Sequence, residues 1–497
     1  MKILLYLTAI AIGFTFVQEP INDPDLGWHL FGGAWISNFG YLPRSDVVNS
    51  FNSVWRDYHW LAQIVIYQLY DLGWYPLLKI AYAALVAYLF KVVLDIILTL
   101  GGRNISFTIS LVVFLLCVAL IAPHLAIRPQ VMALFLIALA LRAFLHGKRE
   151  HEPLLIVGLA LLTAVTANIH VYWVIFPFIW GALRVIPALL RQRYSRKYSL
   201  LVLAVLFCCG ALSPYGLNNY LIVWDYLQTD PYLSANIDEL RGGFRQGGSL
   251  PYLLAVYLLI LLPFLPSKRA RADCGRAFLA LSGVVLTIYS AKFAPLLALF
   301  SLPFLIRHIL RPLRKVVPRL VHEEQTLFGI LAGTVLLASI LVSAWNWPSM
   351  APQSDPDLTR RASFTADLPV QACGAASQTF SSLRSKQRTH WRILTHFNDG
   401  GWCRWGAYLA NPLLDMRVTT DGRTQDADPR NIERSSAIYN LEGDWQKTLA
   451  DWAPEFILAR NASPFQTLLA KDPAWREIYS DRIYKVFVFE RPNLPRG

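Results

Sequence analysis

The residues best suited to chemistry lie just after the first apolar run of the chain. Two carboxylates, Asp23 and Asp25, flank Pro24, and an imidazole, His29, follows close behind. A carboxylate at the water–lipid boundary can take the proton of an attacking hydroxyl and so act as a general base. The same residues also suit a helix start, with an Asp cap and proline at the first helical position. Spacing alone leaves catalysis and capping as evenly weighted interpretations.

The rest of this loop offers further polar side chains that could contact a substrate. Asp46 follows Pro43, where a turn or cap is the favoured interpretation. His29 and His59 are expected to make interfacial hydrogen bonds, because their spacing matches no closed zinc pattern. The sequence identifies no cofactor, and it leaves a divalent metal open without supporting one. The apolar segment 59–70 is too short to span a bilayer and suits a helix lying along its surface.

The composition decides the class of protein that must position these groups. Of 497 residues, 55% are hydrophobic and 16% are charged, whereas soluble domains carry about 25% charged residues. The net charge is +13. A nucleic-acid-binding protein gathers its basic residues on a soluble face, but here they lie between long apolar runs. The sequence therefore predicts a polytopic, mainly α membrane protein without a nucleic-acid partner.

Long apolar runs mark the predicted membrane spans. A helix needs about 20 apolar residues to cross a bilayer, and the chain contains about eleven such runs. The first run follows the basic residue Lys2, which is the arrangement of a secretory signal, but no small-x-small cleavage site comes after the run. We interpret it as an uncleaved first span. The runs start near Ile3, Tyr75, Ser106, Gln130, Pro153, Val171, Tyr198, Leu250, Ala277, Lys292 and Thr326.

The distribution of Lys and Arg predicts the orientation. Five basic groups fall between alternate pairs of spans, and short cytoplasmic loops are enriched in these residues. All five groups lie on one side if the N-terminus is cytoplasmic. The extracytoplasmic face then receives the loop at 18–73, the loop at 213–249 and the tail after Trp345.

Two domains are expected from this arrangement. Residues 1–346 form the transmembrane domain, including the first outer loop, and residues 347–497 form a small extracytoplasmic α/β domain. Cys373 and Cys403 are the only cysteines of the tail. An oxidising compartment permits a disulfide there, but spacing does not show whether the two side chains meet. The predicted strands are Ile393–Phe397, Phe456–Ala459 and Tyr484–Glu490, with a helical segment around Trp445–Trp452.

Four polar residues stand at the outer ends of predicted spans. Arg128 could bind a lipid phosphate bidentately or could simply snorkel to the interface. Lys292 is a basic residue on the predicted outer side, where the positive-inside rule expects few of them, and this favours the phosphate interpretation. Asn168 and His170 could hydrogen-bond sugar hydroxyls, although contacts between helices are the favoured role. The Asp238-Glu239 pair is expected to be a solvated loop.

Several motifs carry a resemblance to a known family. The first loop contains D-P-D-L-G-W-H-L, G-Y-L-P-R-S-D and W-R-D-Y-H-W-L-A-Q, and the tail contains F-N-D-G-G-W, T-D-G-R and W-R-E-I-Y-S-D. Together they resemble bacterial membrane proteins related to the GT-C glycosyltransferases. These are polyprenyl-phosphate-sugar-dependent enzymes akin to protein O-mannosyltransferases and lipid A aminoarabinose transferases. The likeness continues at Ile127–Gln130, Ala167–His170 and Ser213–Gly216.

The resemblance implies an inverting sugar transfer at the outer face of a bacterial cytoplasmic membrane. The donor would be a polyprenyl-phosphate-sugar, and the acceptor a lipid, glycan or protein. The family's catalytic acid maps onto Asp25 or Asp23, with Asp25 preferred because it precedes the Leu-Gly-Trp-His helix. Arg128 and Lys292 would then stabilise the departing phosphate. A W-W-D-Y-G motif is missing, so transfer to asparagine is not expected.

Two other functions compete with this one. A transporter or flippase should carry ionisable residues deep within its spans. Here Lys91 and Asp95 can pair with each other at i,i+4 spacing, and few other charges lie deep. A non-catalytic protein of envelope polysaccharide assembly is the third alternative, since retained acids do not prove turnover.

Overall fold

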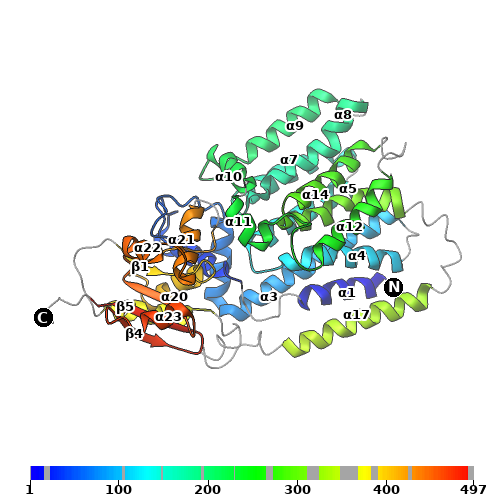
Figure 1. Cartoon of the computed structure of the whole chain (residues 1–497). Helices are drawn as coiled ribbons and strands as arrows, with labels where there is room; N and C mark the ends of the chain where they lie inside the picture. The colour runs from blue at the N-terminus through cyan, green and yellow to red at the C-terminus, as the bar shows by residue number, and fades with distance from the viewer. Residues whose placement is uncertain are drawn as a thin grey trace. The chain divides into compact units, whose positions relative to one another are not determined.

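The computed structural model describes residues 2–15, 23–102, 107–146, 149–191, 195–228, 230–264, 273–310, 324–346, 368–381, 390–423 and 428–490 (Figure 1). The chain divides into two compact units. The helical unit consists of Met1–Glu19 and Leu77–Ala351, and the loop–tail unit of Pro20–Pro76 and Pro352–Gly497. The sequence groups the first outer loop with residues 1–346, whereas in the structure that loop packs with the tail.

The helical unit is built from apolar helices, with short 3₁₀ or π segments between some of them. Its helices are α1 (Lys2–Thr15), the second part of α3 (Trp60–Gly101), α4 (Phe107–Ile121), α5 (Pro129–His146), α6 (Glu152–Thr166), α7 (Ile175–Trp180), α8 (Ile186–Arg191), α9 (Arg196–Cys209), α10 (Asn218–Leu227), α11 (Pro231–Asn236), α12 (Leu250–Leu261), α14 (Cys274–Tyr289), α15 (Ala294–Phe304) and α17 (Glu324–Asn346). The turns used below are η3 (Val171–Val174), η5 (Asp238–Leu240) and η7 (Ala291–Phe293).

Each apolar run predicted from the sequence is helical over its described residues. Among the described residues, five helical stretches are long and apolar enough to cross a membrane: Trp60–Gly101, Phe107–His124, Pro129–His146, Val171–Leu190 and Ala291–Ile309. Shorter apolar helices, including α1, α6, α12 and α14, accompany them. These helices agree with the predicted membrane protein, while crossing by all eleven runs remains a prediction.

Helices α1 and α17 lie side by side, although they are far apart in the sequence (Figure 1). Two hydroxyl groups of α1 reach carbonyl groups of α17. Thr8 Oγ1 lies 3.4 Å from the Ala332 oxygen, and Thr15 Oγ1 lies 3.3 Å from the Ser339 oxygen. In an apolar setting such hydroxyl contacts hold neighbouring helices together.

Helix α3 is broken near the boundary between the two units. Gly73 and Trp74 have non-helical backbone angles, and Trp74 has a positive φ of 57°. Pro76 follows two residues later and cannot donate to the helix ladder, so the helix cannot continue smoothly through this point. The segment expected to form an interfacial helix, 59–70, makes up most of the first part of α3.

The loop–tail unit combines helices with a five-stranded mixed sheet of order β2-β1-β3-β5-β4. Strand β1 pairs in parallel with β2 and β3, and β5 runs antiparallel to β3 and β4. The strands are β1 (Trp391–Leu394), β2 (Met416–Val418), β3 (Phe456–Arg460), β4 (Trp475–Ser480) and β5 (Tyr484–Phe489). The helices are α2 (Leu26–Phe39), the first part of α3, α19 (Val370–Ser381), α20 (Gly400–Ala410), α21 (Pro429–Asn440), α22 (Trp445–Trp452) and α23 (Pro464–Leu469).

The secondary structure predicted for the tail matches several of these elements. The predicted strands at 456–459 and 484–490 match β3 and β5 to within one residue, and the predicted helix matches α22, whereas the strand predicted at 393–397 overlaps only the last two residues of β1. Strands β2 and β4 were not predicted. The first loop adds to the sheet edge through a parallel bridge between Asn49 and Val418. A buried apolar cluster supports the sheet: Leu394, Ile438, Trp452, Ile457, Ala459, Phe465, Leu469 and Phe487.

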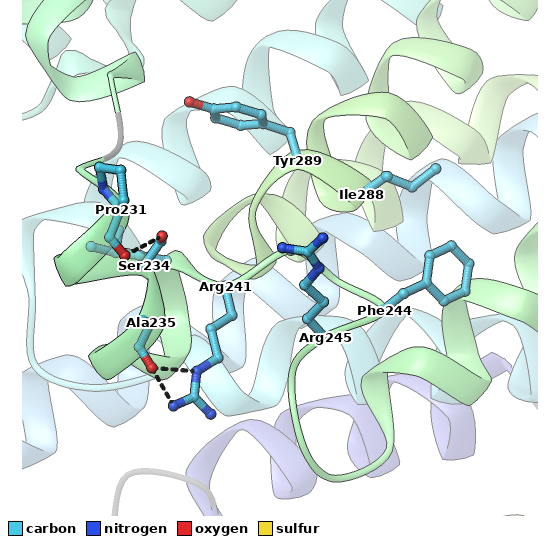
Figure 2. A pocket seen from close by; sticks show the side chains of 10 residues that line it. Pro231, Ser234, Ala235, Arg241, Phe244, Arg245, Ile288 and Tyr289 are labelled. Carbon is cyan, nitrogen blue, oxygen red and sulfur yellow. Dashed lines mark hydrogen bonds between the residues drawn. The ribbon is translucent and has the colours of Figure 1, made fainter.

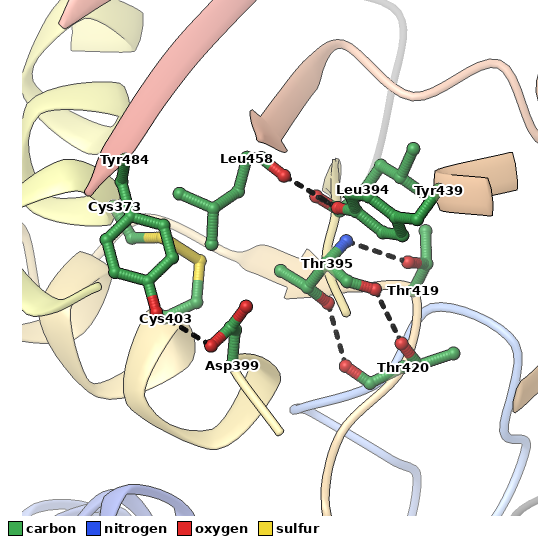
Figure 3. The surroundings of a disulfide bond; sticks show 10 residues. All are labelled: Cys373, Leu394, Thr395, Asp399, Cys403, Thr419, Thr420, Tyr439, Leu458 and Tyr484. Carbon is green, nitrogen blue, oxygen red and sulfur yellow. Dashed lines mark hydrogen bonds between the residues drawn. A yellow bond between two sulfur atoms is a disulfide. The ribbon is translucent and has the colours of Figure 1, made fainter. Parts of the chain in front are cut away.

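A disulfide joins Cys373 of α19 to Cys403 of α20 (Figure 3). The pairing that the sequence left open is therefore formed. Nearby, the Thr395 hydroxyl donates a hydrogen bond of 2.7 Å to the Thr420 carbonyl. This bond ties the end of β1 to the turn that begins at Thr420. The disulfide ties α20 to α19, which are the two helices that carry Cys403 and Cys373.

Candidate active site

Asp25 occupies the cap position of α2, but its side chain does not cap the helix. Trp28 Nε1 instead donates a hydrogen bond of 3.2 Å to Asp25 Oδ1. The residue is partly exposed. The capping interpretation of this side chain thus receives no support from its contacts. A carboxylate that one indole holds in place, and that is not fully buried, is suited to accept a proton.

Asp23 holds the backbone of Asp25 in place. This residue is buried, and its Oδ1 accepts a hydrogen bond of 3.1 Å from the backbone N–H of Asp25. Its own carbonyl oxygen accepts a bond of 2.7 Å from Trp402 Nε1. Of the two acids, Asp25 is the more accessible, and Asp23 holds the backbone that carries it.

Two tail segments lie directly against this pair. A Cβ atom added to Gly422 would come within 2.3 Å of Asp25 Oδ1, so only glycine allows the carboxylate to approach so closely. Gly422 belongs to T-D-G-R, and Trp402 to F-N-D-G-G-W. The motifs that carry the resemblance in the first loop and in the tail are therefore neighbours within one unit.

Asp46 is fully buried in an ion-pair cluster with Arg423 and Asp421. The Arg423 guanidinium lies 2.8 Å from Asp46 and 2.7 Å from Asp421. Asp46 also accepts hydrogen bonds from the backbone N–H groups of Val48 and Asn49. This is the turn and cap geometry that the sequence favoured for Asp46. Its oxygens are occupied by protein groups, which suits a structural role.

Charge and burial oppose one another in this cluster. Burial raises the pKa of Asp46, and the nearby Asp421 charge adds to that effect, although Arg423 acts against it. Burial also acts to raise the pKa of Asp421, but Arg423 outweighs it and holds that pKa below its usual value. The two carboxylates together raise the pKa of Arg423 despite its burial. The guanidinium is thereby locked in its charged form.

His29 and His59 contact Trp28 and form a second polar group with Gln63 and Asp57. The centre of the His29 ring lies 3.6 Å from that of Trp28, with the two rings tilted by 38°, and the His29 ring stands edge-on to His59 at 5.3 Å. Gln63 Nε2 lies 3.5 Å from His29 Nδ1 and donates a 2.8 Å bond to Asp57 Oδ1. Both histidines are buried. They are therefore packed around Trp28, the residue that contacts Asp25, and do not project into open solvent.

The sequence did not single out Asp57 as a candidate. It is almost fully buried, and its Oδ2 has no hydrogen-bond partner among the described residues. Burial raises the pKa of Asp57 to about 7, although Arg423 and hydrogen bonds from His59 and Gln63 act to lower it. The only signal in the sequence was its place in W-R-D-Y-H-W. Over the part of the chain that is described, no group of three or more His, Cys, Asp or Glu residues is arranged to hold a metal ion.

Arg128 stands at the start of α5 in the helical unit. Its Nη1 nitrogen lies 3.0 and 3.1 Å from the two carboxylate oxygens of Glu239 in η5. The expected solvated loop at Asp238-Glu239 thus supplies an ion-pair partner. The pair is only partly buried, with 41% of the Glu239 side chain exposed. An incoming anion could therefore replace this carboxylate.

Lys292 lies in η7 and is buried. Its Nζ donates a 2.9 Å bond to the Tyr226 carbonyl and sits 3.8 Å from the centre of the Tyr226 ring. Gln130 and Tyr172 both reach the Lys292 carbonyl, at 3.5 and 3.3 Å. The starts of α5, η3 and η7 are therefore linked around one aromatic cluster.

His170 joins this same cluster, whereas Asn168 bonds backbone groups. The His170 ring meets Tyr172 and Tyr226 edge-on, and its Nδ1 accepts the Tyr172 N–H. Asn168 Nδ2 donates to the carbonyls of Ala164 and Leu212, both at 2.8 Å. The Asn168 contact joins segments 44 positions apart, which is the helix–helix role favoured from the sequence.

The structure therefore gathers the sequence-predicted residues into two groups. Asp23, Asp25, His29, Asp46 and His59 belong to the loop–tail unit. Arg128, Asn168, His170 and Lys292 belong to the helical unit. Trp28 contacts Asp25, His29 and His59, and Tyr226 contacts both His170 and Lys292.

The fold resembles that of solved membrane transferases. The oligosaccharyltransferase AglB from Archaeoglobus fulgidus, in complex with an inhibitory peptide and a dolichol-phosphate, matches with a TM-score of 0.60 at 10% identity, over 99% of this chain and 74% of that one. ArnT from Cupriavidus metallidurans, bound to undecaprenyl phosphate, matches with a TM-score of 0.51 at 13% identity, over 98% and 97% of the two chains. The apo form of the Archaeoglobus fulgidus oligosaccharyltransferase matches with a TM-score of 0.56 at 11% identity, over 92% and 69%. At such low identity these likenesses show the fold alone. A scan against protein-family models finds no match, and neither does a search of curated protein sequences.

Proposed function

We propose that this chain, which has the GT-C fold of those transferases, is an inverting glycosyltransferase. It moves a sugar from a polyprenyl-phosphate donor to an acceptor at the outer face of a bacterial cytoplasmic membrane. The observation that carries the proposal is the position of the Asp25 carboxylate. Trp28 donates a hydrogen bond to it, Gly422 lies against it, and it makes no capping hydrogen bond to α2. The neighbours that are bound to dolichol-phosphate or undecaprenyl phosphate support the class of donor.

Asp25 acts as the general base. The acceptor hydroxyl loses its proton to Asp25 while its oxygen forms a bond to the anomeric carbon. The bond from that carbon to the phosphate oxygen breaks on the opposite side, and the polyprenyl phosphate leaves with the electron pair. Attack opposite the leaving group inverts the anomeric configuration. Asp23 keeps the base in position through the Asp25 backbone N–H.

Arg128 and Lys292 stabilise the departing phosphate. Positive groups fixed where negative charge develops lower the barrier to transfer. Both side chains have partners now, Glu239 and the Tyr226 carbonyl. The donor phosphate replaces Glu239 as the partner of Arg128, and a guanidinium matches phosphate geometry well.

The orientation belongs to the same proposal. With the N-terminus cytoplasmic, the acid pair follows the first span on the outer side, and the tail is extracytoplasmic. The alternation of basic groups between spans supports this arrangement. The disulfide between Cys373 and Cys403 is in keeping with an oxidising compartment for the tail.

The deep charges of the helical unit give a flippase less support. Asp95 of α3 accepts a 2.9 Å contact from Lys91, as the spacing predicted, and further contacts from Tyr6 and Arg142. A carboxylate with three such partners is neutralised in place. It resembles a structural ion pair more than a site that exchanges its ligand during transport.

Single substitutions at the acid pair test the proposal. Asp25→Asn should abolish sugar transfer from a polyprenyl-phosphate donor in membranes, and Asp23→Asn should reduce it, with expression and thermal stability close to wild type. Asp451→Asn, at an exposed acid of α22, is the matched control. Full transfer by both variants would overturn the base assignment. A wild-type protein that transfers no sugar but moves lipid across vesicles would establish the flippase instead.

A further inference from the structure

A cavity of about 760 Å³ opens in the helical unit, next to the turn that carries Glu239. Figure 2 shows it between α11, the segment after η5 and the end of α14. Its wall is partly apolar and partly basic. The residues that matter for its chemistry are Leu240, Arg241, Phe244, Arg245, Ile288 and Tyr289.

The backbone of this wall is fixed against the end of α14. The Gly243 N–H donates a 2.9 Å bond to the Thr287 carbonyl, and the Ala291 N–H donates a 2.8 Å bond to the Arg241 carbonyl. A Cβ atom on Gly243 would come within 2.5 Å of the Thr287 oxygen, so the close approach depends on glycine. The segment that carries the two arginines is therefore held in place before any ligand arrives.

The two guanidinium groups have spare hydrogen-bonding capacity. Arg241 donates to the Ala235 carbonyl from Nε at 3.2 Å and from Nη2 at 2.6 Å, and its Nη1 pairs with Asp238 at 2.7 Å. The Asp238 side chain is 71% exposed, and such surface pairs contribute little. Arg245 is exposed, and Figure 2 shows its guanidinium without a bond to the other lining residues. A guanidinium carries five N–H groups, so Arg241 keeps two for an anion besides those of Arg245, and an anion can also replace the exposed Asp238 as its partner.

Apolar side chains stand beside these charges. Phe244, Ile288 and Tyr289 are 48%, 42% and 47% exposed. A purely ionic ligand would leave this surface in contact with water, at a cost that grows with its area. The lining therefore fits a molecule in which an anionic group is joined to an apolar portion.

The residues assigned to the donor phosphate are not part of this wall. Arg128 is engaged by Glu239, and Lys292 by Tyr226. We propose that the cavity binds the phosphate or carboxylate of the acceptor, which is an anionic amphiphile. This inference rests on the proposed transfer reaction, because a transferase with a lipid-linked donor needs a separate place for its second substrate.

Binding of a simple anionic amphiphile tests the inference without requiring transfer. The full-length protein in the neutral detergent dodecyl maltoside is titrated with dodecyl phosphate, and inorganic phosphate serves as the head group alone. We expect Arg245→Gln to weaken dodecyl phosphate binding, and Arg241→Gln with Arg245→Gln to weaken it by about tenfold or more, the scale of charge-assisted hydrogen bonds. Arg430→Gln, at an arginine with 76% side-chain exposure in the loop–tail unit, should bind as wild type does.

Three results would overturn the inference. Dodecyl phosphate could bind the double variant as tightly as wild type. Inorganic phosphate could bind as tightly as dodecyl phosphate, which would leave the apolar wall without a role. Polyprenyl phosphate could lose as much affinity in Arg245→Gln as in Arg128→Gln, which would make the cavity part of the donor site. Failure of sugar transfer alone would refute the proposed function but would not alter these binding results.

Discussion

The Arg423 guanidinium contacts both carboxylate oxygens of Asp46, at 2.8 and 3.1 Å, across 377 positions of sequence. Asp46 is fully buried, and Arg423 is 5% exposed. The same guanidinium binds Asp421, so one cation serves two buried anions. The contact joins the first loop to the tail and holds the Gly422 turn that lies against Asp25.

Removing the shared cation should destabilise the loop–tail unit. Arg423→Met leaves two buried carboxylates without their partner, and we expect a loss of about 3–5 kcal/mol. Thermal or denaturant unfolding of the purified protein, followed by tryptophan fluorescence, measures it. Arg430→Met removes an exposed arginine that pairs with Asp428 and should leave the curve unchanged. Equal stability of the two variants would contradict the structural role of Arg423.

The indole of Trp28 should matter for rate through one hydrogen bond. Trp28→Phe keeps an aromatic ring beside His29 but loses the donor to Asp25. We expect kcat/KM for sugar transfer to fall about tenfold or more, as for a bond to a charged group. Trp35→Phe, on the same helix, removes an indole N–H that has no partner among the described residues. Its kinetics should match wild type, and a similar loss in both variants would point to packing.

Glu239 should compete with the donor for Arg128. Glu239→Gln removes the competing charge, so the KM for the polyprenyl-phosphate donor should fall about two- to fivefold, the scale of an exposed ion pair. Kinetics over a donor concentration series give the value. Glu150→Gln, at an exposed acid, is the control and should leave the KM unchanged. A raised KM in Glu239→Gln would show that Glu239 assists donor binding.

Asp57 should make stability depend on pH. Its pKa of about 7 in the folded protein lies above the ordinary value of 3.8, so the unfolded chain releases this proton at lower pH than the folded protein. Stability is therefore lost as the pH rises from about 4 to about 7 and levels off above that. Asp57→Asn has no group that titrates at this position. Its free energy of unfolding, relative to that of wild type, should therefore rise by about 3 kcal/mol between pH 5 and pH 8. Parallel stability curves for the two proteins would contradict the raised pKa.

The Cys373–Cys403 disulfide should stabilise the tail. It closes a loop of 30 residues between α19 and α20, and its removal by the double serine variant should cost about 2–4 kcal/mol. The unfolding of the wild-type protein in the absence and in the presence of a reductant provides an independent comparison of the disulfide-bonded and reduced forms. Cys208→Ser, at an exposed unpaired cysteine, should unfold as wild type does.

Local patterns in the sequence predicted the helices well. Apolar runs are recognisable residue by residue, and each predicted run is helical where it is described. The strands β1, β3 and β5 were found because they are apolar. Strand β2 has only three residues, and β4, with the sequence W-R-E-I-Y-S, is largely exposed at the sheet edge. Neither offers enough hydrophobic signal to be recognised alone.

The partners of polar residues were much harder to predict. The sequence drew attention to Asp46, but nothing local indicates Arg423 as its partner. Glu239 was expected to be solvated, yet it pairs with Arg128 across 111 positions. Asp57 has an elevated pKa because of its burial, which depends on the whole unit. Spacing identifies which side chains could do chemistry, whereas long-range packing decides which of them are already occupied.

The contact between Asp46 and Arg423 also has a consequence during synthesis of the chain. Ribosomes add about 5–20 residues per second, so Asp46 emerges on the order of 20 to 75 seconds before its cation. Until then, the first loop carries an acid destined for a dry interior and must remain hydrated. A nascent chain truncated before the tail could not complete this loop. We therefore expect such fragments to be recognised by membrane quality-control proteases even though the helices of the helical unit are present.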